Sequence, residues 1–255
     1  MEPGEKIKMS KSRRTALITG SGRNIGRAAA LALAAQGTNV VLNGSSNQAA
    51  CLTVADEARA LGVDAAVAMG NVGSLDGLAA ITESAFSAFG RIDILVNNAA
   101  VRPTSPFLET DEEEWTRILD IDFHSARRLA KVFLPGMIEN GWGRIINFAG
   151  MNAIHGYNGR APVSVSKHAS WGLTKSLAKE FGAKGVTANI ISPGPIRPDE
   201  ADPEMRAHIE GMVGRVPIGR LGESEEVAAM VALLASDAGA FINGQLLQVN
   251  GGAET

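Results

Sequence analysis

The segment ALITGSGRNIG, residues 16–26, decides the fold class of this chain. A short apolar run leads directly into glycines spaced G-x-G-x-x-x-G, and a helical pattern follows. Glycines in such a turn let the backbone approach a phosphate closely, and the start of the next helix offers free N–H groups at the positive end of its dipole. The segment therefore predicts a strand, a phosphate-binding turn and a helix.

Short apolar runs alternate with longer helical patterns along the rest of the chain. Most of the runs are continuous rather than alternating, which predicts strands buried on both faces of a parallel sheet. Strands are expected at Ala16–Thr19, Asn39–Asn43, Asp64–Met69, Ile92–Asn97, Arg144–Phe148, Thr187–Ile191 and Gln245–Val249. Helices are expected at Ile25–Gln36, Gln48–Leu61, Leu75–Phe89, Glu112–Asn140, Val163–Phe181 and Ser224–Ala235. This order predicts a Rossmann-type, doubly wound α/β fold with about seven parallel strands.

Punctuation residues set the expected boundaries. Five helices are expected to end at the glycines that follow them, which are Gly37, Gly62, Gly90, Gly141 and Gly182. Residues 1–14 are interpreted as a flexible tail, and residues 15–255 as one domain. The stretch 194–217 is rich in proline, glycine and charge, and is a candidate lid over a substrate.

Composition excludes several classes of function. The formal net charge of −3 provides no basic surface for nucleic acid, and no apolar run is long enough to span a membrane. A single cysteine, Cys51, fits a reducing compartment, so a cytoplasmic location is expected. No pattern of histidines or cysteines has metal-ligand spacing, so no metal site is expected.

Several motifs, in the expected order, resemble those of the short-chain dehydrogenase/reductase family. The turn TGSGRNIG, residues 19–26, is similar to the family's Thr-Gly-x-x-x-Gly-x-Gly turn, with Asn24 in place of the middle glycine. GRIDILVNNAA at 90–100 resembles its Asn-Asn-Ala-Gly strand, and ISPG at 191–194 resembles its Pro-Gly motif. The segment 220–252 resembles its C-terminal part. The resemblance implies an NAD(P)(H)-dependent oxidoreductase that acts on a carbonyl or alcohol, and a homo-oligomer, most often a tetramer.

The end of the second expected strand indicates which dinucleotide is used. An acid at this position would bond the ribose hydroxyls and repel a 2′-phosphate, whereas this chain has NGSS at 43–46. Arg23 in the glycine turn could pair with that phosphate, so NADP(H) is favoured over NAD(H). Cofactor contacts are expected at Gly20, Gly22, Arg23, Asn24, Ile25, Gly26, Ser45, Asn71, Val72, Asn98, Ala99, Lys167, Pro193, Gly194 and Ile196.

The catalytic positions depart from the family pattern. The resemblance implies a set of Asn, Ser, Tyr and Lys, in which the tyrosine exchanges a proton with the substrate oxygen and the lysine lowers the tyrosine's pKa. Lys167 matches the lysine, but Val163 stands at the tyrosine position, Gly150 at the serine position and Asp122 at the asparagine position. Valine and glycine side chains cannot exchange a proton. An ordinary carbonyl reduction therefore needs a substitute donor.

Three substitutes remain open. His155 and Tyr157 lie between the strand that leads to Gly150 and the helix that carries Lys167, and Asp122 is either an acid–base group or a plain ion-pair partner of Lys167. His155 and Tyr157 could equally do no more than line a pocket. Asn152 lies in the same loop.

The pattern also leaves the reaction class and the substrate open. A non-redox enzyme, such as a lyase, dehydratase or isomerase using Asp122 and Lys167, is the first alternative. A catalytically silent NADP-binding subunit is the second. The substrate is expected to be a small molecule, and Arg102, Arg160 and Arg197, which flank the family's pocket, suggest that it is anionic.

Overall fold

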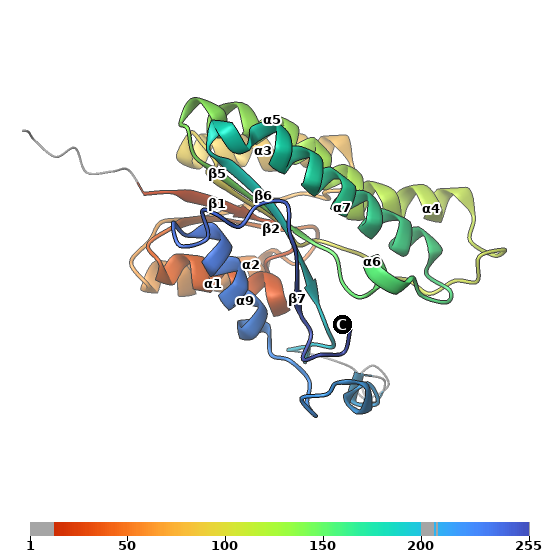
Figure 1. Ribbon diagram of the computed structural model, residues 1–255. Coiled ribbons are helices and arrows are strands. Elements are labelled where there is room, and N and C mark those ends of the chain that lie inside the picture. Colours follow the sequence, from red (N-terminus) through yellow and green to blue (C-terminus); the bar gives the residue numbers. More distant parts are fainter. Residues whose placement is uncertain (1–12, 200–206, 208, 255) are drawn as a thin grey trace, which may run out of the picture.

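The computed structural model describes residues 13–199, 207 and 209–254. Its centre is one seven-stranded parallel sheet in the order β3-β2-β1-β4-β5-β6-β7 (Figure 1). The strands are β1 (Thr15–Ile18), β2 (Asn39–Gly44), β3 (Ala65–Met69), β4 (Ile94–Asn97), β5 (Gly143–Phe148), β6 (Val186–Pro193) and β7 (Leu246–Val249). Each coincides with an expected strand to within two residues at either end, so the predicted doubly wound sheet is confirmed.

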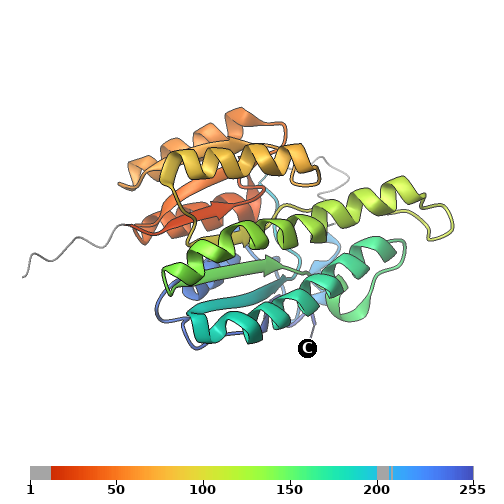
Figure 2. The same ribbon diagram turned by 90° about the horizontal axis from the view of Figure 1, so that it is seen from above.

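Helices cover both faces of the sheet. One face carries α1 (Asn24–Ala35), α2 (Gln48–Ala60) and α9 (Ser224–Ala235). The other carries α3 (Leu75–Phe89), α5 (Ser125–Glu139) and α7 (Ala161–Phe181), which lie side by side when the molecule is seen from above (Figure 2). None of the helices in the described part of the chain is long and apolar enough to cross a membrane.

The inner strands are buried along almost their whole length, because side chains from both of their faces pack into a core. In β1, Ala16 and Ile18 pack against α1, α2 and α9, whereas Leu17 between them packs on the opposite side. The edge strands β3 and β7 are only partly buried, because each has one neighbour instead of two. Burial therefore separates the central strands from the edge strands, although apolar runs located both.

The helix expected at 112–140 is not one helix, and the prediction was wrong here. It consists of α4 (Glu112–Leu119), a π-helical turn η1 (Asp120–His124) and α5. The hydroxyl of Ser125 donates to the carbonyl of Ile121 at 2.6 Å, beside the widened turn. Single π turns of this kind occur frequently at functional sites. Here the turn carries Asp122, which is buried.

Four of the five expected terminal glycines, at 37, 62, 90 and 141, have positive φ angles and end their helices. Gly182 also caps its helix, because α7 ends at Phe181, but its φ is −56° and the chain continues through a 3-10 turn, η2 (Gly182–Lys184). The left-handed conformation falls at Gly185, at φ +83°, where a Cβ would lie 1.9 Å from the carbonyl oxygen of Gly141. Two short helices, α6 (Asn152–His155) and η3 (Val213–Arg215), were not expected. Within the expected lid, residues 200–206 and 208 lie outside the described residues.

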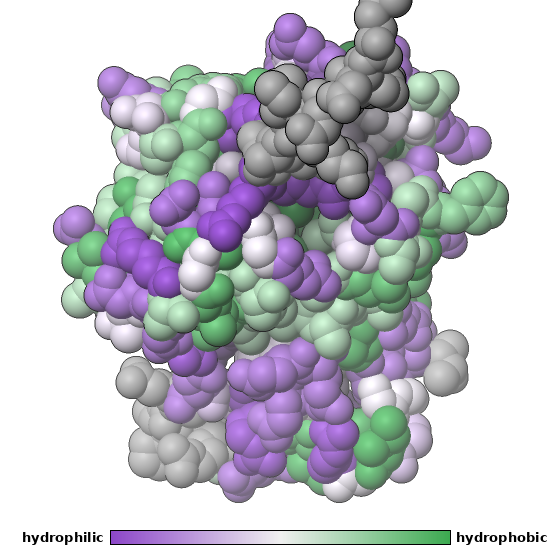
Figure 3. Space-filling view, turned by 90° about the vertical axis from the view of Figure 1, so that its left-hand side faces the viewer, coloured by the Kyte–Doolittle hydropathy of each residue, from purple (hydrophilic) through white to green (hydrophobic). Residues whose placement is uncertain are grey.

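At the amino edge of the sheet, two arginine guanidinium groups stack on a tryptophan ring. The guanidinium carbons of Arg14 and Arg144 lie 3.6 and 4.2 Å from the centre of a Trp142 ring. The surface at this end mixes polar and apolar residues (Figure 3). The residues that can do chemistry gather at the opposite, carboxyl edge, as is the rule for open α/β sheets.

Candidate active site

The glycine-rich turn between β1 and α1 has a backbone conformation that requires glycine or asparagine at particular positions. Gly20 adopts φ +64°, and a Cβ on Gly26 would lie 2.1 Å from the carbonyl oxygen of Gly20. Asn24 has φ +50°, a left-handed conformation that asparagine adopts more readily than most residues. The backbone of the turn is therefore exposed to a ligand at close range.

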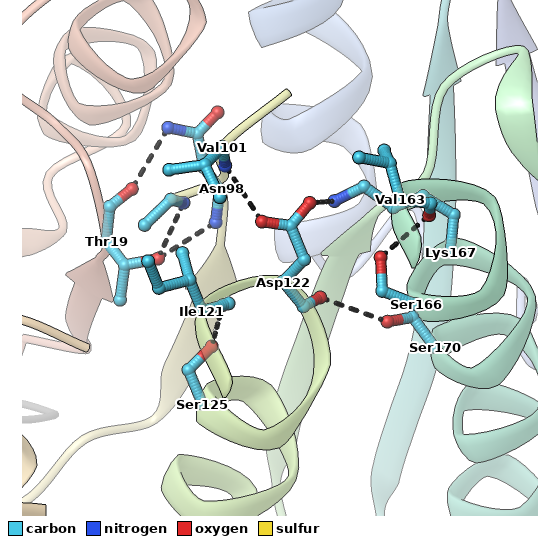
Figure 4. A network of polar contacts seen from close by, with 11 residues as sticks. Thr19, Asn98, Val101, Ile121, Asp122, Ser125, Val163, Ser166, Lys167 and Ser170 are labelled. Carbon is cyan, nitrogen blue, oxygen red and sulfur yellow. Dashed lines mark hydrogen bonds and ion pairs between the residues drawn. The ribbon is translucent and has the colours of Figure 1, made fainter. Parts of the chain in front are cut away.

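Asn98 and Thr19 brace this turn from the end of β4. The Asn98 side-chain amide donates to the carbonyls of Thr19 and Gly20, both at 3.0 Å. The Thr19 hydroxyl accepts from the amides of Asn98 at 2.9 Å and Ala99 at 3.0 Å (Figure 4). The bonds of the Asn98 amide thus hold the turn in shape. This role of Thr19 was not expected, although the residue lies directly before the first glycine of the turn.

The turn and its surroundings fit a phosphate-bearing nucleotide. Helix α1 begins at Asn24, and its N-cap residue Arg23 makes no side-chain cap. Arg23 and Ser45 are exposed, and no hydrogen bond or ion pair joins the Arg23 side chain to another described residue. Asn71 is exposed too, and its side-chain oxygen accepts from the Gly73 amide at 2.9 Å. Val72 is buried beside it.

Asp199 reaches the same turn from beyond β6. Its carboxylate accepts from the Asn24 amide at 2.6 Å, and its own amide donates to the Asn24 side chain at 2.8 Å. A negative charge thus lies against the first amide of α1, from which the phosphates of a nucleotide would also accept a hydrogen bond. This contact spans 175 residues of sequence and was not expected.

The segment after β6 is held on its other side by the start of α9. Gly194 donates to the carbonyl of Val249 at 3.0 Å, and Ile196 forms a β-bridge with Gly222. A Cβ on Gly194 would lie 2.7 Å from Cα of Asn250, which explains the glycine after Pro193. The Pro193–Gly194–Ile196 corner therefore forms a rigid wall at the carboxyl edge.

Lys167 and Asp122 form a buried ion pair, with Nζ and Oδ2 3.0 Å apart (Figure 4). Their side chains are only 3% and 0% exposed. The other carboxylate oxygen of Asp122 accepts from the Val101 amide at 2.8 Å. The structure thus brings together two of the four expected catalytic residues, and it seals them from water.

Burial and charge act on this pair in opposite directions. Desolvation lowers the pKa of Lys167 below its ordinary value, the Asp122 carboxylate raises it, and the nearby Arg102 guanidinium lowers it further. The net direction is down. Burial likewise lowers the pKa of Arg102, with Asp122 opposing and Arg160 adding to the shift.

Two other positions of interest carry no polar side chain. Val163 is fully buried on α7, one turn before Lys167. Gly150 follows β5 at φ +105°, with no atom within 4 Å of the position that a Cβ would take. A side chain at residue 150 would find room but would strain the backbone.

Tyr157 and His155 are not joined to the Lys167–Asp122 pair. Tyr157, the single tyrosine of the sequence, is 37% exposed and lines a pocket of about 80 Å³ with Met151, Pro195 and Glu254. His155 forms an ion pair with Glu254 at the same pocket. The Arg160 guanidinium lies 4.9 Å from the Tyr157 ring centre. The side chain of Asn152 lies outside the described residues.

A chain of buried polar groups supports the π turn from behind. Asn97 donates to Asn147 at 2.8 Å, Asn147 to Thr174 at 2.9 Å, and Thr174 to the carbonyl of Ser170 at 2.7 Å. The Ser170 hydroxyl then reaches the carbonyl of Asp122 at 3.4 Å. This chain of hydrogen bonds was not expected, since its members are ordinary polar residues spread over three elements.

The fold and the glycine-rich turn define the class: a Rossmann-type α/β protein with a nucleotide cradle at the carboxyl edge of its sheet. The family model described as enoyl-(acyl carrier protein) reductase matches residues 20–254. The chain is 35% identical over 246 residues to a 3-oxoacyl-[acyl-carrier-protein] reductase, FabG, of Staphylococcus aureus, covering 96% of this chain and 99% of that protein. It is 36% identical over 237 residues to the FabG of Escherichia coli, covering 93% and 96% respectively.

Solved structures agree. The crystal structure of acetoin dehydrogenase YohF from Salmonella typhimurium is 31% identical, with a TM-score of 0.86, covering 94% of this chain and 97% of that one. Acetoin dehydrogenase from Enterobacter cloacae is 30% identical, with a TM-score of 0.87, covering 96% of each chain. The chain belongs to the short-chain dehydrogenase/reductase family. It is an NAD(P)-dependent oxidoreductase of that family.

Proposed function

We propose that the protein interconverts a small carbonyl compound and its alcohol with NADP(H), using a proton donor other than the family's usual tyrosine. The observation that carries the proposal is the braced glycine turn. At the start of α1 lies an exposed Arg23, whose side chain pairs with no other described residue, and no acid follows β2. A guanidinium in this place suits a 2′-phosphate, which an acid would repel.

The residues of the carboxyl edge divide the binding of the dinucleotide among them. The amides of Asn24 and Ile25 at the start of α1 suit the pyrophosphate, and Arg23 and Ser45 suit the phosphorylated ribose. Asn71 and Val72 suit the adenine end, and the Pro193–Gly194–Ile196 wall suits the nicotinamide end. When bound, the dinucleotide supplies or accepts the hydride. The chain must then deliver or accept one proton at the substrate oxygen.

We assign the transfer of that proton to Tyr157. Val163 and Gly150 stand where the family resemblance places a tyrosine and a serine, and neither side chain can donate. Lys167 is sealed and already paired with Asp122. Tyr157 is accessible and shares its pocket with Pro195, next to the nicotinamide wall. His155 is engaged by Glu254 and is assigned a supporting role at the rim of the pocket.

Asp122 and Lys167 are then positioning residues. Asp122 holds the Val101 amide, which fixes the strand-to-loop connection beside the cleft, and Lys167 neutralises the carboxylate. A small substrate with negative charge, a homotetramer and a cytoplasmic location complete the proposal.

The test compares Y157F with H155Q in NADPH-dependent reduction of a panel of small carbonyl compounds. We expect Y157F to lower kcat by roughly 10²- to 10⁴-fold, the usual contribution of a general acid, and to leave NADPH affinity unchanged. H155Q should change kcat far less. Full activity in Y157F would overturn the assignment of the donor. An active wild type would still support the oxidoreductase.

A catalytically silent NADP-binding subunit is the second candidate function. The burial of the Lys167–Asp122 pair favours it, because a sealed lysine cannot contact a substrate oxygen. NADPH binding without turnover of any carbonyl or alcohol in the panel would select this candidate.

A further inference from the structure

The loop after β4 and the loop before α7 are tied together beside the cleft. The Ser105 amide donates to the carbonyl of Gly159 at 2.8 Å, and the Arg160 side chain donates to the Thr104 hydroxyl at 3.0 Å. Each loop contributes one arginine: Arg102 from the first and Arg160 from the second. The backbone just before Arg102 is also fixed, because the Val101 amide is held by Asp122.

Arg102 directly follows Val101, whose amide is held by Asp122, so its backbone lies beside the buried Lys167–Asp122 pair. More than a third of the residue is exposed, yet protein surrounds it closely enough that desolvation lowers its pKa. No hydrogen bond or ion pair joins it to another described residue. A guanidinium has five N–H donors in a fixed fork, so Arg102 has this fork available for a ligand.

The charges beside Asp122 do not balance. Asp122 acts on both Arg102 and Lys167, while Arg102 and Arg160 repel one another. Lys167 already neutralises Asp122 at 3.0 Å. Among the described residues, no carboxylate forms an ion pair with Arg102 or Arg160.

We propose that Arg102 binds a carboxylate of the substrate, with Arg160 supporting it, so that the substrate is a carbonyl compound bearing a carboxylate or the corresponding hydroxy acid. The inference rests on the proposed function for the reaction, but the binding of the carboxylate stands apart from hydride transfer. A planar carboxylate matches one guanidinium fork in two parallel hydrogen bonds. Arg160 contributes mainly charge, since Thr104 and the Tyr157 ring already engage it.

Arg197 does not belong to this site. Its guanidinium pairs with Glu223 at 3.1 Å, at the start of α9. The sequence grouped it with Arg102 and Arg160 because all three lie in segments around the pocket. Arg197 therefore serves as the matched control, an arginine that is already neutralised.

The experiment uses calorimetric titration of the full chain, saturated with NADPH, with oxamate and with its neutral amide, oxamide. Oxamate carries a carboxylate beside a carbonyl that the enzyme does not reduce, so binding is read without turnover. We expect oxamate to bind and oxamide not to bind. R102Q should weaken oxamate binding by about tenfold or more, R160Q by a smaller factor, and R197Q should leave it unchanged.

Equal binding of oxamate by the wild type, R102Q and R160Q would overturn the proposal, as would no discrimination between oxamate and oxamide. Failure of the wild type to bind oxamate would overturn it too. If carbonyl compounds are not turned over but oxamate binding responds to R102Q as expected, the proposed function fails and this inference stands. If neutral carbonyl compounds are turned over and oxamate does not bind, the reverse holds.

Discussion

The Lys167 ammonium lies 3.0 Å from the Asp122 carboxylate, and this ion pair joins α7 to the π turn between α4 and α5. The same carboxylate holds the Val101 amide, so one buried acid connects three segments of the carboxyl edge. The side chains of the pair are only 3% and 0% exposed, so both charges are buried. The first consequence of the pair concerns stability rather than chemistry.

D122N should destabilise the protein by about 3 to 5 kcal/mol, because it leaves the buried Lys167 cation without its counter-charge. The asparagine oxygen can still accept from the Val101 amide, so the loss of stability reports the missing negative charge alone. Urea unfolding measures it. The double variant D122N/K167M should recover much of the loss. A D122N protein within about 1 kcal/mol of the wild type would show that the pair is not structurally important.

G26A should abolish NADPH binding and destabilise the fold by about 1 to 3 kcal/mol, because its Cβ would lie 2.1 Å from the carbonyl oxygen of Gly20. G172A is the control: it lies within α7, and no atom lies within 4 Å of the Cβ position. Alanine there should stabilise the helix by up to about 1 kcal/mol. Thermal unfolding with and without NADPH distinguishes the two, and normal binding by G26A would contradict the cradle.

D199N should bind NADPH about three- to tenfold more tightly than the wild type, since its carboxylate faces the amide of Asn24 that a pyrophosphate would use. The gain should shrink at high salt. The control is D237N, whose carboxylate pairs with Arg14 at the amino edge of the sheet. Unchanged or weaker binding of NADPH by D199N would contradict a competition between Asp199 and the pyrophosphate for the Asn24 amide.

Glu226 provides a pH prediction. Hydrogen bonds from Arg220 and from the Glu223 amide lower the pKa of Glu226 from 4.5 to about 2. A lowered carboxyl pKa contributes stability above the unfolded value, and that stability is lost as the pH falls through the range from 4.5 to 2. R220Q should therefore be less stable than the wild type at neutral pH and equal to it in strong acid. A difference that does not vary with pH would contradict this.

The sheet could be predicted because its signals are local. Apolar runs, helix patterns and the glycine turn each report on a few consecutive residues, and all seven strands were located. The π turn could not be predicted, because LDIDFH continues the helical pattern of its neighbours and only packing against α7 reveals the extra residue. Gly182 caps α7 as expected, but the left-handed conformation that ends the segment falls at Gly185, three residues later.

Within the candidate site, the sequence identified one contact correctly. It gave Asp122 and Lys167 as possible partners, and the structure shows them paired. It could not show that Arg197 pairs with Glu223, whereas no described residue forms a hydrogen bond or ion pair with Arg102. Nor could it show the Asn24–Asp199 contact, since 175 residues separate the two and neither lies in a shared motif.

The most direct test of the account is a fluorescence titration of the protein with NADPH and with NADH. The wild type should bind NADPH at least about tenfold more tightly than NADH, and R23Q should remove most of that difference. R27Q, whose arginine pairs with Glu57, should not. No binding of either dinucleotide, or NADH binding as tight as NADPH binding, would contradict the account.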